Sequence, residues 1–236
     1  MNHTHLFEGL LDQTGAKVLT QWLGKQGVII HRQSAVTALN GTDELESITV
    51  GEQTLPLTLL GVGIGIDLTT DLAAQAGLTV NRGVVTNASF RTSDDDIFAV
   101  GDLAEFYHPL FNEYQLLGNW THAAASARVA AQVIAGQSAT YSLVSGYTST
   151  ALPFPITMIG NFQSAPDRLI AESGEKNGYP SYLEFRIRDN RLVSAGLINF
   201  PELQGAIRAI VAQRRLIPER STTAADIIRL ATDQTS

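Results

Sequence analysis

The sequence of 236 residues contains no cysteine. This absence excludes a disulfide framework, a cysteine zinc site and thiol redox chemistry within the chain. It leaves the compartment open, because a protein without thiols tolerates oxidising and reducing surroundings alike. The start, MNHTHLFEGLLDQ, also lacks the basic and apolar regions of a signal peptide. We therefore expect a cytoplasmic protein.

Positive charge is scarce as well. Lysine occurs only at Lys17, Lys25 and Lys176, and 16 Lys and Arg residues stand against 23 Asp and Glu residues. Proteins that bind nucleic acid usually carry a basic face, so a nucleic-acid partner is not expected. No apolar run reaches the roughly 18 residues of a membrane span. A hydrophobic fraction of 44% predicts an ordinary folded core in one or two domains.

Hydrophobic periodicity predicts an α/β half followed by a smaller α+β domain. In the second part, Leu183, Phe185 and Ile187 alternate with polar residues, which is typical of a half-buried antiparallel strand. Residues 138–150 resemble a linker because Ser, Thr and Gly dominate them, and 103–118 are predicted to be a loop. Helices are expected at 16–26, 71–75, 120–134, 201–214 and 224–231, and strands at 28–31, 35–39, 47–50, 57–61, 81–86, 97–100, 156–160, 169–172, 182–188 and 192–200. The helix at 120–134 is almost uncharged, so it is expected to be packed on most sides.

The run LTLLGVGIG over residues 57–65 is apolar with little alternation, which favours a strand covered on both faces. It holds Gly-x-Gly-x-Gly from Gly61 to Gly65. We do not interpret it as a dinucleotide-binding fingerprint, because neither a third close-packing glycine nor a long helix follows. The whole sequence contains no GxGxxG at the start of a βαβ unit.

The segment RTSDDDIFAVGD, residues 91–102, carries the strongest chemical signal. A short apolar strand, 97–100, is predicted to end in Gly101-Asp102. Ligands of open α/β sheets lie beyond the carboxyl ends of the strands. Gly101 permits close approach of the backbone to a ligand, and the Asp102 carboxylate can accept hydrogen bonds from sugar hydroxyls. The helix that starts near Trp120 would add a partial positive charge of about 0.5 at its N-terminus.

This segment resembles the second FAD-binding segment of the pyridine nucleotide-disulfide oxidoreductases, and in particular their cysteine-free ferredoxin and rubredoxin reductase branch. The family pattern is a Thr, an apolar strand with a middle Ala, and then Gly-Asp. The matching residues here are Thr92, Ile97, Phe98, Ala99, Gly101 and Asp102. The resemblance implies a two-dinucleotide-fold flavoprotein with FAD and NAD(P)H as cofactors, in which Asp102 binds the ribityl chain of the flavin.

The flanking segments match in the same order, and the resemblance extends from about Leu11 to Pro218. Upstream it includes 71–78 and 83–86, and LTLLGVGIG resembles the end of an NAD-binding domain. Downstream, 119–136 resembles the helix whose start lies at the flavin pyrimidine ring. The resemblance thus implies these cofactor-binding residues: Gly61, Gly63, Gly101, Leu103, Asn119, Trp120 and Thr121 beside Asp102. It implies no catalytic side chain and no metal.

The resemblance also implies a domain plan. Residues 1–65 would be the C-terminal part of an NAD(P)-binding domain, 66–140 the second segment of an FAD-binding domain, and 141–236 a C-terminal α+β interface domain. The missing glycine fingerprints indicate that the first half of a family member is absent. Two local departures stand out: relatives usually have Pro near Ile66, and many have Glu where this chain has Gly118, which removes an acid–base candidate.

Less specific interpretations stand beside these. Asp102 could be a simple turn residue, and Trp120 could pack in the core. His31, His108 and His122 are expected to be structural or surface residues. Consecutive carboxylates do not converge on one face, so Asp94-Asp95-Asp96 is predicted to be a solvated turn rather than a metal site. A metal role for His3 and His5 has little support.

The function implied by the resemblance is hydride transfer from NAD(P)H to flavin. Without cysteine, electrons would leave to an outside acceptor such as an iron–sulfur protein, a quinone or oxygen. A basic spot formed by Arg208, Arg214 and Arg215 could steer an acidic redox partner, but a solvated helix face is the favoured interpretation. The alternative is a non-catalytic fragment or split subunit that serves in assembly. A sheet cut in mid-domain exposes edges, so we expect the isolated chain to be poorly soluble or dimeric.

Overall fold

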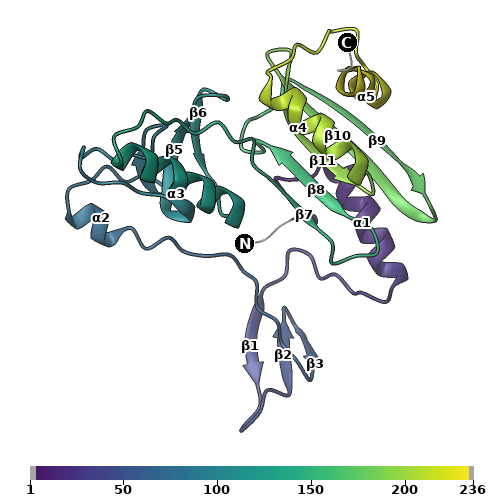
Figure 1. The fold of residues 1–236 in the computed structure, drawn as a ribbon. Coiled ribbons are helices and arrows are strands. Elements are labelled where there is room, and N and C mark those ends of the chain that lie inside the picture. Colours follow the sequence, from purple (N-terminus) through teal and green to yellow (C-terminus); the bar gives the residue numbers. More distant parts are fainter. Residues whose placement is uncertain (1–3, 234–236) are drawn as a thin grey trace. The chain divides into compact units, whose positions relative to one another are not determined.

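The structure, a computed structural model, describes residues 4–233. The chain divides into two compact units between Asp67 and Leu68 (Figure 1). His3 lies outside the described residues. Among the helices of residues 4–233, none combines the length and the apolar character that crossing a bilayer requires.

The first unit contains one helix and one small sheet. Helix α1 spans Gln13–Lys25, and its N-cap Asp12 accepts a hydrogen bond from the Gly15 backbone N–H at 2.8 Å. Strands β1 (Val36–Asn40), β2 (Ser47–Val50) and β3 (Gln53–Pro56) form an antiparallel sheet in that order. A turn follows β1 after Asn40. A side chain at Gly41 would lie 1.8 Å from the Glu44 carbonyl oxygen, so the turn needs glycine.

Two strand predictions in this unit are wrong. Residues 28–31 and 57–61 are not strands in the structure. The run LTLLGVGIG is not covered either, since Leu59 is 87% exposed and Ile64 is 86% exposed. A buried strand needs neighbours on both edges and cover on both faces. The sheet β1-β2-β3 ends at Pro56, so it supplies residues 57–61 with neither a paired neighbour strand nor cover for their faces.

The second unit begins with α2 (Asp71–Gln75) and a three-stranded sheet of order β4-β5-β6. Strand β4 spans Val84–Thr86 and runs parallel to β5 (Ala104–His108), while β6 (Glu113–Leu116) is antiparallel to β5. The sheet packs with helix α3 (Trp120–Ile134), whose bounds are those predicted. The expected loop at 103–118 is therefore wrong, because it contains β5 and β6.

The expected strand at 97–100 is also absent. This segment forms a single bridge, from Phe98 to Arg91, and Ile97 and Val100 are each more than one third exposed. A second correction concerns α3, which buries only the stripe of His122, Ser126 and Ala130 rather than most of its surface. The helix is nearly uncharged because it is rich in alanine, but a high alanine content does not predict that a helix is buried on every side.

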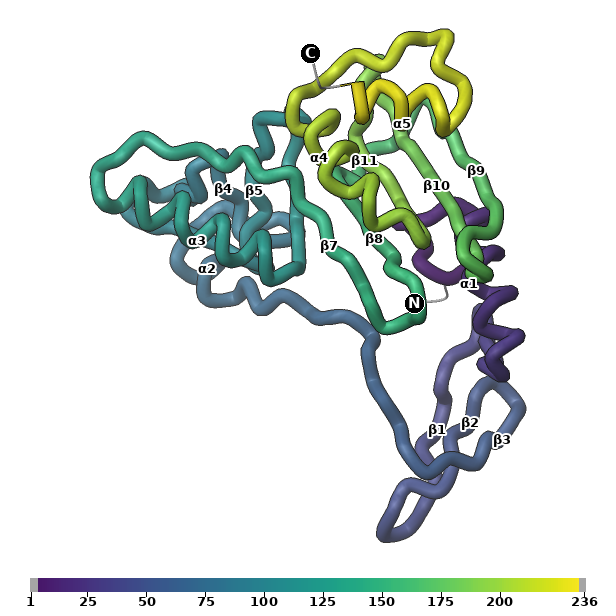
Figure 2. The backbone as a smooth tube through the Cα atoms, turned by 45° about the vertical axis from the view of Figure 1, so that its right-hand side comes forward, coloured from purple at the N-terminus to yellow at the C-terminus, as the bar shows by residue number. Residues whose placement is uncertain are grey.

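The remainder of the unit is a five-stranded antiparallel sheet of order β7-β8-β11-β10-β9. Helices α4 and α5 pack on it (Figure 2), and their Ile207, Ile210 and Ile227 join Phe185 and Leu197 in the core. A short 3-10 helix, η2, precedes α4. The bounds are β7 Gly146–Ser149, β8 Ile156–Gly160, β9 Arg168–Lys176, β10 Tyr179–Arg188, β11 Arg191–Ile198, η2 Pro201–Leu203, α4 Gln204–Ala212 and α5 Ala224–Thr232.

Two predictions for this part need correction. The expected linker at 138–150 contains β7 and buries Tyr141 and Val144, so it belongs to the folded unit. Strand β10 is antiparallel as predicted but not half-buried, since Tyr182 and Glu184 are buried along with the apolar residues. Glu184 tolerates burial because it pairs with Arg186 and accepts a hydrogen bond from the Tyr182 hydroxyl at 3.2 Å.

Candidate functional site

The turn at Gly101-Asp102 occupies the junction between the 97–100 segment and β5. Gly101 has φ +68°, a left-handed conformation that favours glycine, and opens the 3-10 helix η1 (Gly101–Leu103). Asp102 is exposed. Its Oδ2 would lie 3.5 Å from a side chain built on Gly118, so the carboxylate lies beside the residue that precedes the N-cap of α3. The turn and the start of α3 thus form one site.

Helix α3 holds this turn through its buried stripe. Ser126 Oγ accepts the Gly101 backbone N–H at 3.0 Å and lies 2.9 Å from the Ala123 carbonyl oxygen, to which it donates. His122 lies one turn earlier on the same stripe, fully buried, with Nδ1 2.9 Å from the Tyr141 hydroxyl. Residues four apart on a helix share a face, so both polar side chains point towards the turn side of α3.

The segment after the turn is held from the opposite direction by Glu105. This buried carboxylate accepts hydrogen bonds from the Asn81 side chain and from the Arg82 and Gly83 backbone N–H groups at 2.9–3.2 Å. Arg82 Nε adds an ion pair at 3.2 Å. Burial raises the pKa of Glu105, but the Gly83, Arg82 and Asn81 hydrogen bonds lower it more, so it lies below its usual value. Asp102 is therefore anchored on both flanks.

The start of α3 carries the remaining predicted residues. Asn119 is the N-cap, with Oδ1 accepting the His122 backbone N–H at 2.8 Å and Nδ2 donating to Ser145 Oγ at 3.0 Å. Trp120 is 86% exposed, which excludes the core-packing interpretation. Thr121 is exposed next to it. A 15-residue helix directs its partial positive charge at whatever lies before this end.

The predicted residues thus fall into two groups. Gly101, Asp102, Leu103, Asn119, Trp120 and Thr121 belong to the second unit and gather at the turn and the start of α3. Gly61 and Gly63 belong to the first unit, where both are exposed and a side chain on either would meet open space. Their backbone therefore does not require glycine locally.

A buried aromatic cluster supports the turn from below. Phe90, Phe106 and Tyr141 surround His122, whose ring stacks on Phe106 with centroids 4.8 Å apart. Burial lowers the pKa of His122, against the opposing effects of the Gly101 backbone and the Asp102 charge. The neighbouring His108 is buried as well, and burial lowers its pKa to about 4. Both rings are therefore neutral near pH 7, as their structural role requires.

Sequence reasoning missed four residues of this arrangement: Glu105, Ser126, Tyr141 and the supporting role of His122. One signal was available for two of them. His122 and Ser126 are polar residues four positions apart on a helix otherwise rich in alanine, and such spacing places both on one face. Glu105 and Tyr141 contact the turn region through tertiary packing alone, which no local pattern indicates.

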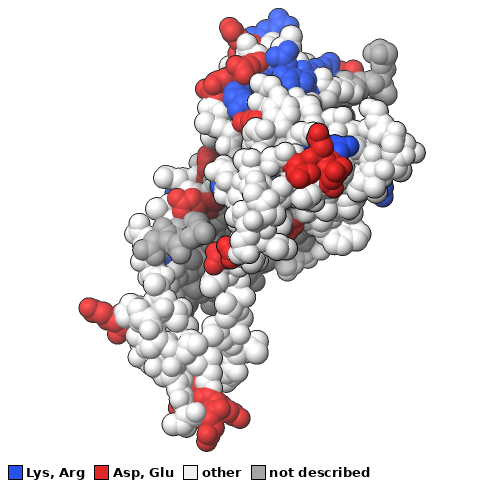
Figure 3. Space-filling model, turned by 90° about the vertical axis from the view of Figure 1, so that its left-hand side faces the viewer, with Lys and Arg blue, Asp and Glu red and all other residues white. Residues whose placement is uncertain are grey.

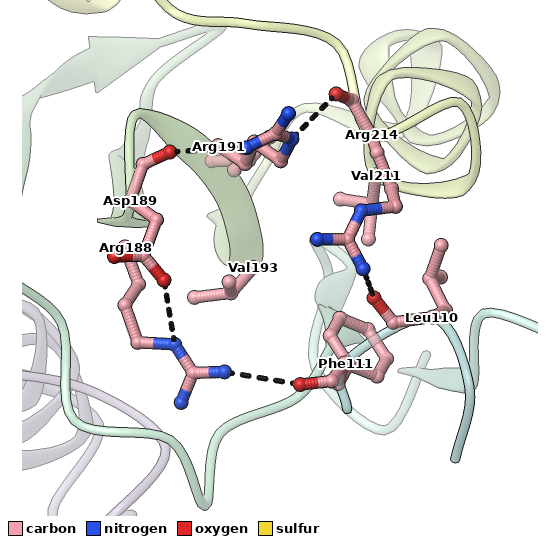
Figure 4. Close-up of a pocket in the computed structure, with 9 residues that line it drawn as sticks. Leu110, Phe111, Arg188, Asp189, Arg191, Val193, Val211 and Arg214 are labelled. Atoms are coloured by element: carbon pink, nitrogen blue, oxygen red, sulfur yellow. Dashed lines mark hydrogen bonds and ion pairs between the residues drawn. The ribbon is translucent and has the colours of Figure 1, made fainter. Parts of the chain in front are cut away.

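An apolar groove lies on the far side of the turn segment. It measures about 510 Å³ and lies between α2 and the 97–100 segment, with Leu72, Phe98 and Leu103 among its lining residues. Another hollow in this unit has only about 30 Å³, room for little more than a water molecule. Its rim is formed by Arg188, Arg191 and Arg214, as Figure 4 shows.

The arginines predicted to form a basic spot are tied to backbone carbonyls instead. Arg208 donates to the Val144 oxygen at 2.7 Å, Arg214 to the Leu110 oxygen and Arg215 to the Leu230 oxygen. Arg214 is exposed, as a solvated helix face implies, whereas Arg208 and Arg215 are half-buried. On the face drawn in Figure 3, basic side chains gather mainly at one end, mixed with acidic ones, and most of the surface is uncharged.

The acidic cluster is a turn, as predicted. The Asp96 backbone N–H donates to Asp94 Oδ1 at 2.9 Å, and the Asp94 N–H donates to Thr92 Oγ1 at 3.1 Å. Within residues 4–233, no three His, Asp or Glu side chains converge as metal ligands would. His31 is exposed and His5 contacts the Leu6 carbonyl oxygen.

Comparison with known proteins identifies a matching family and several relatives. Residues 3–127 match the family model described as pyridine nucleotide-disulphide oxidoreductase. The chain is 27% identical to putidaredoxin reductase of Pseudomonas putida over 182 residues, which cover 75% of this chain and 42% of that protein. It is 26% identical to a rubredoxin-NAD(+) reductase of Ectopseudomonas oleovorans over 198 residues, covering 81% of this chain and 50% of the relative.

The fold agrees with a solved structure of the same kind. The crystal structure of a covalent putidaredoxin reductase–putidaredoxin complex matches with a TM-score of 0.84 at 22% identity, covering 99% of this chain and 57% of that one. The chain thus spans about half the length of the proteins it matches. A family model that covers more than half of the chain settles its kinship: the chain belongs to the pyridine nucleotide-disulphide oxidoreductase family.

Proposed function

We propose that the Gly101-Asp102 turn and the start of α3 form part of the FAD site of an NAD(P)H oxidoreductase. The observation that carries the proposal is the exposed Asp102 carboxylate, held on a rigid turn beside the N-terminus of a 15-residue helix. The site residues would be Gly101, Asp102, Leu103, Asn119, Trp120 and Thr121. Gly61 and Gly63 would lie near the nicotinamide cofactor.

The residues present fit such a cofactor. An exposed carboxylate can accept hydrogen bonds from the hydroxyls of a ribityl chain. The N-terminus of α3 favours negative charge, and the exposed Trp120 ring offers an apolar surface to a flat ring system. When bound, the flavin would supply the capacity to take hydride from NAD(P)H and pass electrons on. The chain would bind and orient it, and stabilise the negative charge of its reduced form.

The electron acceptor would lie outside the chain, which has no cysteine to receive electrons. We propose a small iron–sulfur or similar redox protein, or a small-molecule acceptor. Relatives named as ferredoxin and rubredoxin reductases support this choice, as does the complex of putidaredoxin reductase with putidaredoxin. The three domains proposed from the sequence would then be the end of an NAD(P)-binding domain, part of an FAD-binding domain and an interface domain, in a cytoplasmic enzyme.

A second candidate function is non-catalytic assembly, including formation of a homodimer. The observation that favours it is the row of exposed apolar side chains on the 57–66 segment. Leu59, Val62, Ile64 and Ile66 are each at least 70% exposed. A patch of this kind usually marks an interaction surface.

One titration separates the two functions. FAD is added to the purified 236-residue chain, and the flavin fluorescence and absorbance are followed together with the mass by light scattering. Saturable binding of one FAD per chain supports the flavin site. A chain that binds no FAD but self-associates supports the assembly function and contradicts the flavin site.

A further inference from the structure

The position of Gly101 depends on one hydroxyl group of α3. Ser126 Oγ receives the Gly101 N–H at 3.0 Å and itself donates to the Ala123 carbonyl oxygen at 2.9 Å. The hydroxyl is buried, so neither bond competes with solvent. The left-handed φ of Gly101, +68°, is therefore fixed at a specific place on the helix surface.

His122 lies one helical turn before Ser126 on the same buried stripe of α3. Its Nδ1 lies 2.9 Å from the Tyr141 hydroxyl, and its ring stacks on Phe106 with centroids 4.8 Å apart. His122 and Tyr141 therefore form part of the packed base under the stripe of α3 that carries Ser126.

Asp102 depends on the backbone of the turn, which Ser126 holds on the Gly101 side and Glu105 holds on the side that follows. Its carboxylate is exposed, and no hydrogen bond or ion pair holds it within residues 4–233. The direction of its Cα–Cβ bond follows from the backbone of the turn. Whatever fixes Gly101 therefore aims the carboxylate.

We propose that Ser126 and His122, with Tyr141 behind His122, are positioning residues that aim the Asp102 carboxylate at the flavin site. The assignment rests on the proposed function for its target and on the geometry above for its mechanism. None of the three residues touches the cofactor in this account. Ser126 acts through the backbone of Gly101, and His122 and Tyr141 act by supporting the stripe of α3 that carries Ser126.

The first test needs no cofactor. Long-range nitrogen–proton NMR of the 236-residue chain reads the ring nitrogens of His122, and amide hydrogen exchange reads the Gly101 N–H. We expect the Nδ1 signal of His122 to shift in Tyr141→Phe, which removes its hydrogen-bond partner, and Gly101 exchange to increase about tenfold in Ser126→Ala. Ala127→Ser, on the exposed face next to Ser126, is the matched control and should change neither signal. An Nδ1 signal unchanged by Tyr141→Phe, or Gly101 exchange unchanged by Ser126→Ala, would overturn the proposal.

The second test adds FAD and separates this proposal from the proposed function. If the wild type binds no FAD, the proposed flavin function is excluded, whereas the NMR results still test the positioning role of Ser126 and His122. If wild type binds, Ser126→Ala and His122→Leu should each weaken FAD binding by about tenfold, and His122→Gln, which restores a polar side chain beside the Tyr141 hydroxyl, should recover most of the affinity. Affinity lost in Asp102→Asn but retained in both Ser126→Ala and His122→Leu would overturn the positioning role. Ser126→Ala removes a single atom and is expected to fold. It therefore keeps the test decisive even if the histidine variants misfold.

Discussion

Two glycine-containing segments were singled out by sequence, and the structure treats them in opposite ways. Gly101 sits in a left-handed turn that is hydrogen-bonded to α3 and followed by a buried, four-donor carboxylate at Glu105. The glycines at 61 and 63 lie in an extended, exposed segment where a side chain would meet nothing. The difference shows that a motif becomes a site only where neighbouring elements hold it. The hydrogen-bonded turn is preorganised for a ligand, whereas the exposed segment is not.

The strongest contrast should come from adding one methyl group next to the held turn, at Gly83, and one to the exposed segment, at Gly63. Gly83→Ala places a carbon 2.5 Å from the Leu103 carbonyl oxygen and 2.8 Å from the Leu116 side chain. We expect a loss of about 3 kcal/mol in the free energy of unfolding, measured by denaturant titration with circular dichroism. Gly63→Ala should stay within about 0.5 kcal/mol of wild type. Equal effects of the two changes would contradict the contrast.

A somewhat smaller loss is expected in Glu105→Gln. The amide keeps one acceptor oxygen but presents an N–H₂ group to backbone donors, which leaves buried groups unpaired, so unfolding should become easier by about 2 kcal/mol. The pKa of Glu105 is lowered in the folded state, so its stabilising contribution exists above the usual pKa near 4.5 and disappears as the pH falls through the lower folded value. Glu52→Gln, on the exposed β2–β3 turn, is the control. Acid unfolding curves of equal steepness in both variants would count against this role.

Mild acid should weaken the aromatic cluster beneath the turn before it affects the exposed segment. The pKa of His108 falls from 6.5 to about 4, mainly because the ring is buried. A depressed pKa means that the unfolded chain binds the proton first, so stability present above pH 6.5 is lost as the pH falls towards 4. We expect a loss of roughly 1–2 kcal/mol between pH 6.5 and about pH 5. His108→Gln should flatten this slope and His31→Gln should not. A slope that His108→Gln leaves intact would refute the assignment.

The smallest effect on stability is expected at the exposed end of the site. Trp120 is 86% exposed, so Trp120→Ala should change the free energy of unfolding by less than about 0.5 kcal/mol. The same variant should weaken FAD binding, measured by fluorescence titration, because it removes the apolar surface beside the helix start. Ile134→Ala at the other end of α3 provides a control of similar exposure. A large loss of stability in Trp120→Ala would place its ring in the core after all.

The sequence allowed some of this to be predicted, and physical reasons separate the successes from the failures. The bounds of α3 were predictable because Asn119 caps it and Gly136 follows its end. The cap at Thr223 before α5 was predictable for a similar reason. Strands 57–61 and 97–100 were predicted from apolar composition, yet a strand exists only where a neighbour pairs with it. Strands β5 and β6 were missed because their aromatic and polar residues follow no simple alternation.

The Gly101-Asp102 turn at the centre of the site was predictable from the sequence, whereas the residues that hold this turn were not. Gly101-Asp102 stood out as a local pattern, and the family kinship inferred from it is confirmed. The residues that hold it could not be found in the same way, because Glu105 and Tyr141 reach it only through the packing of β5 and of the segment before β7. In the proposed flavin site, the affinity for FAD would depend on both.

The most direct test of the account compares two aspartates of one segment in a calorimetric titration with FAD. Asp102→Asn removes the charge of the held, exposed carboxylate, and Asp95→Asn removes a charge from the nearby turn. We predict saturable binding by wild type, a weakening of about 10- to 100-fold in Asp102→Asn, as expected for the loss of a charged hydrogen bond, and no change in Asp95→Asn. Equal affinities for Asp102→Asn and Asp95→Asn, or no binding by wild type, would contradict the claim that this turn is part of a flavin site.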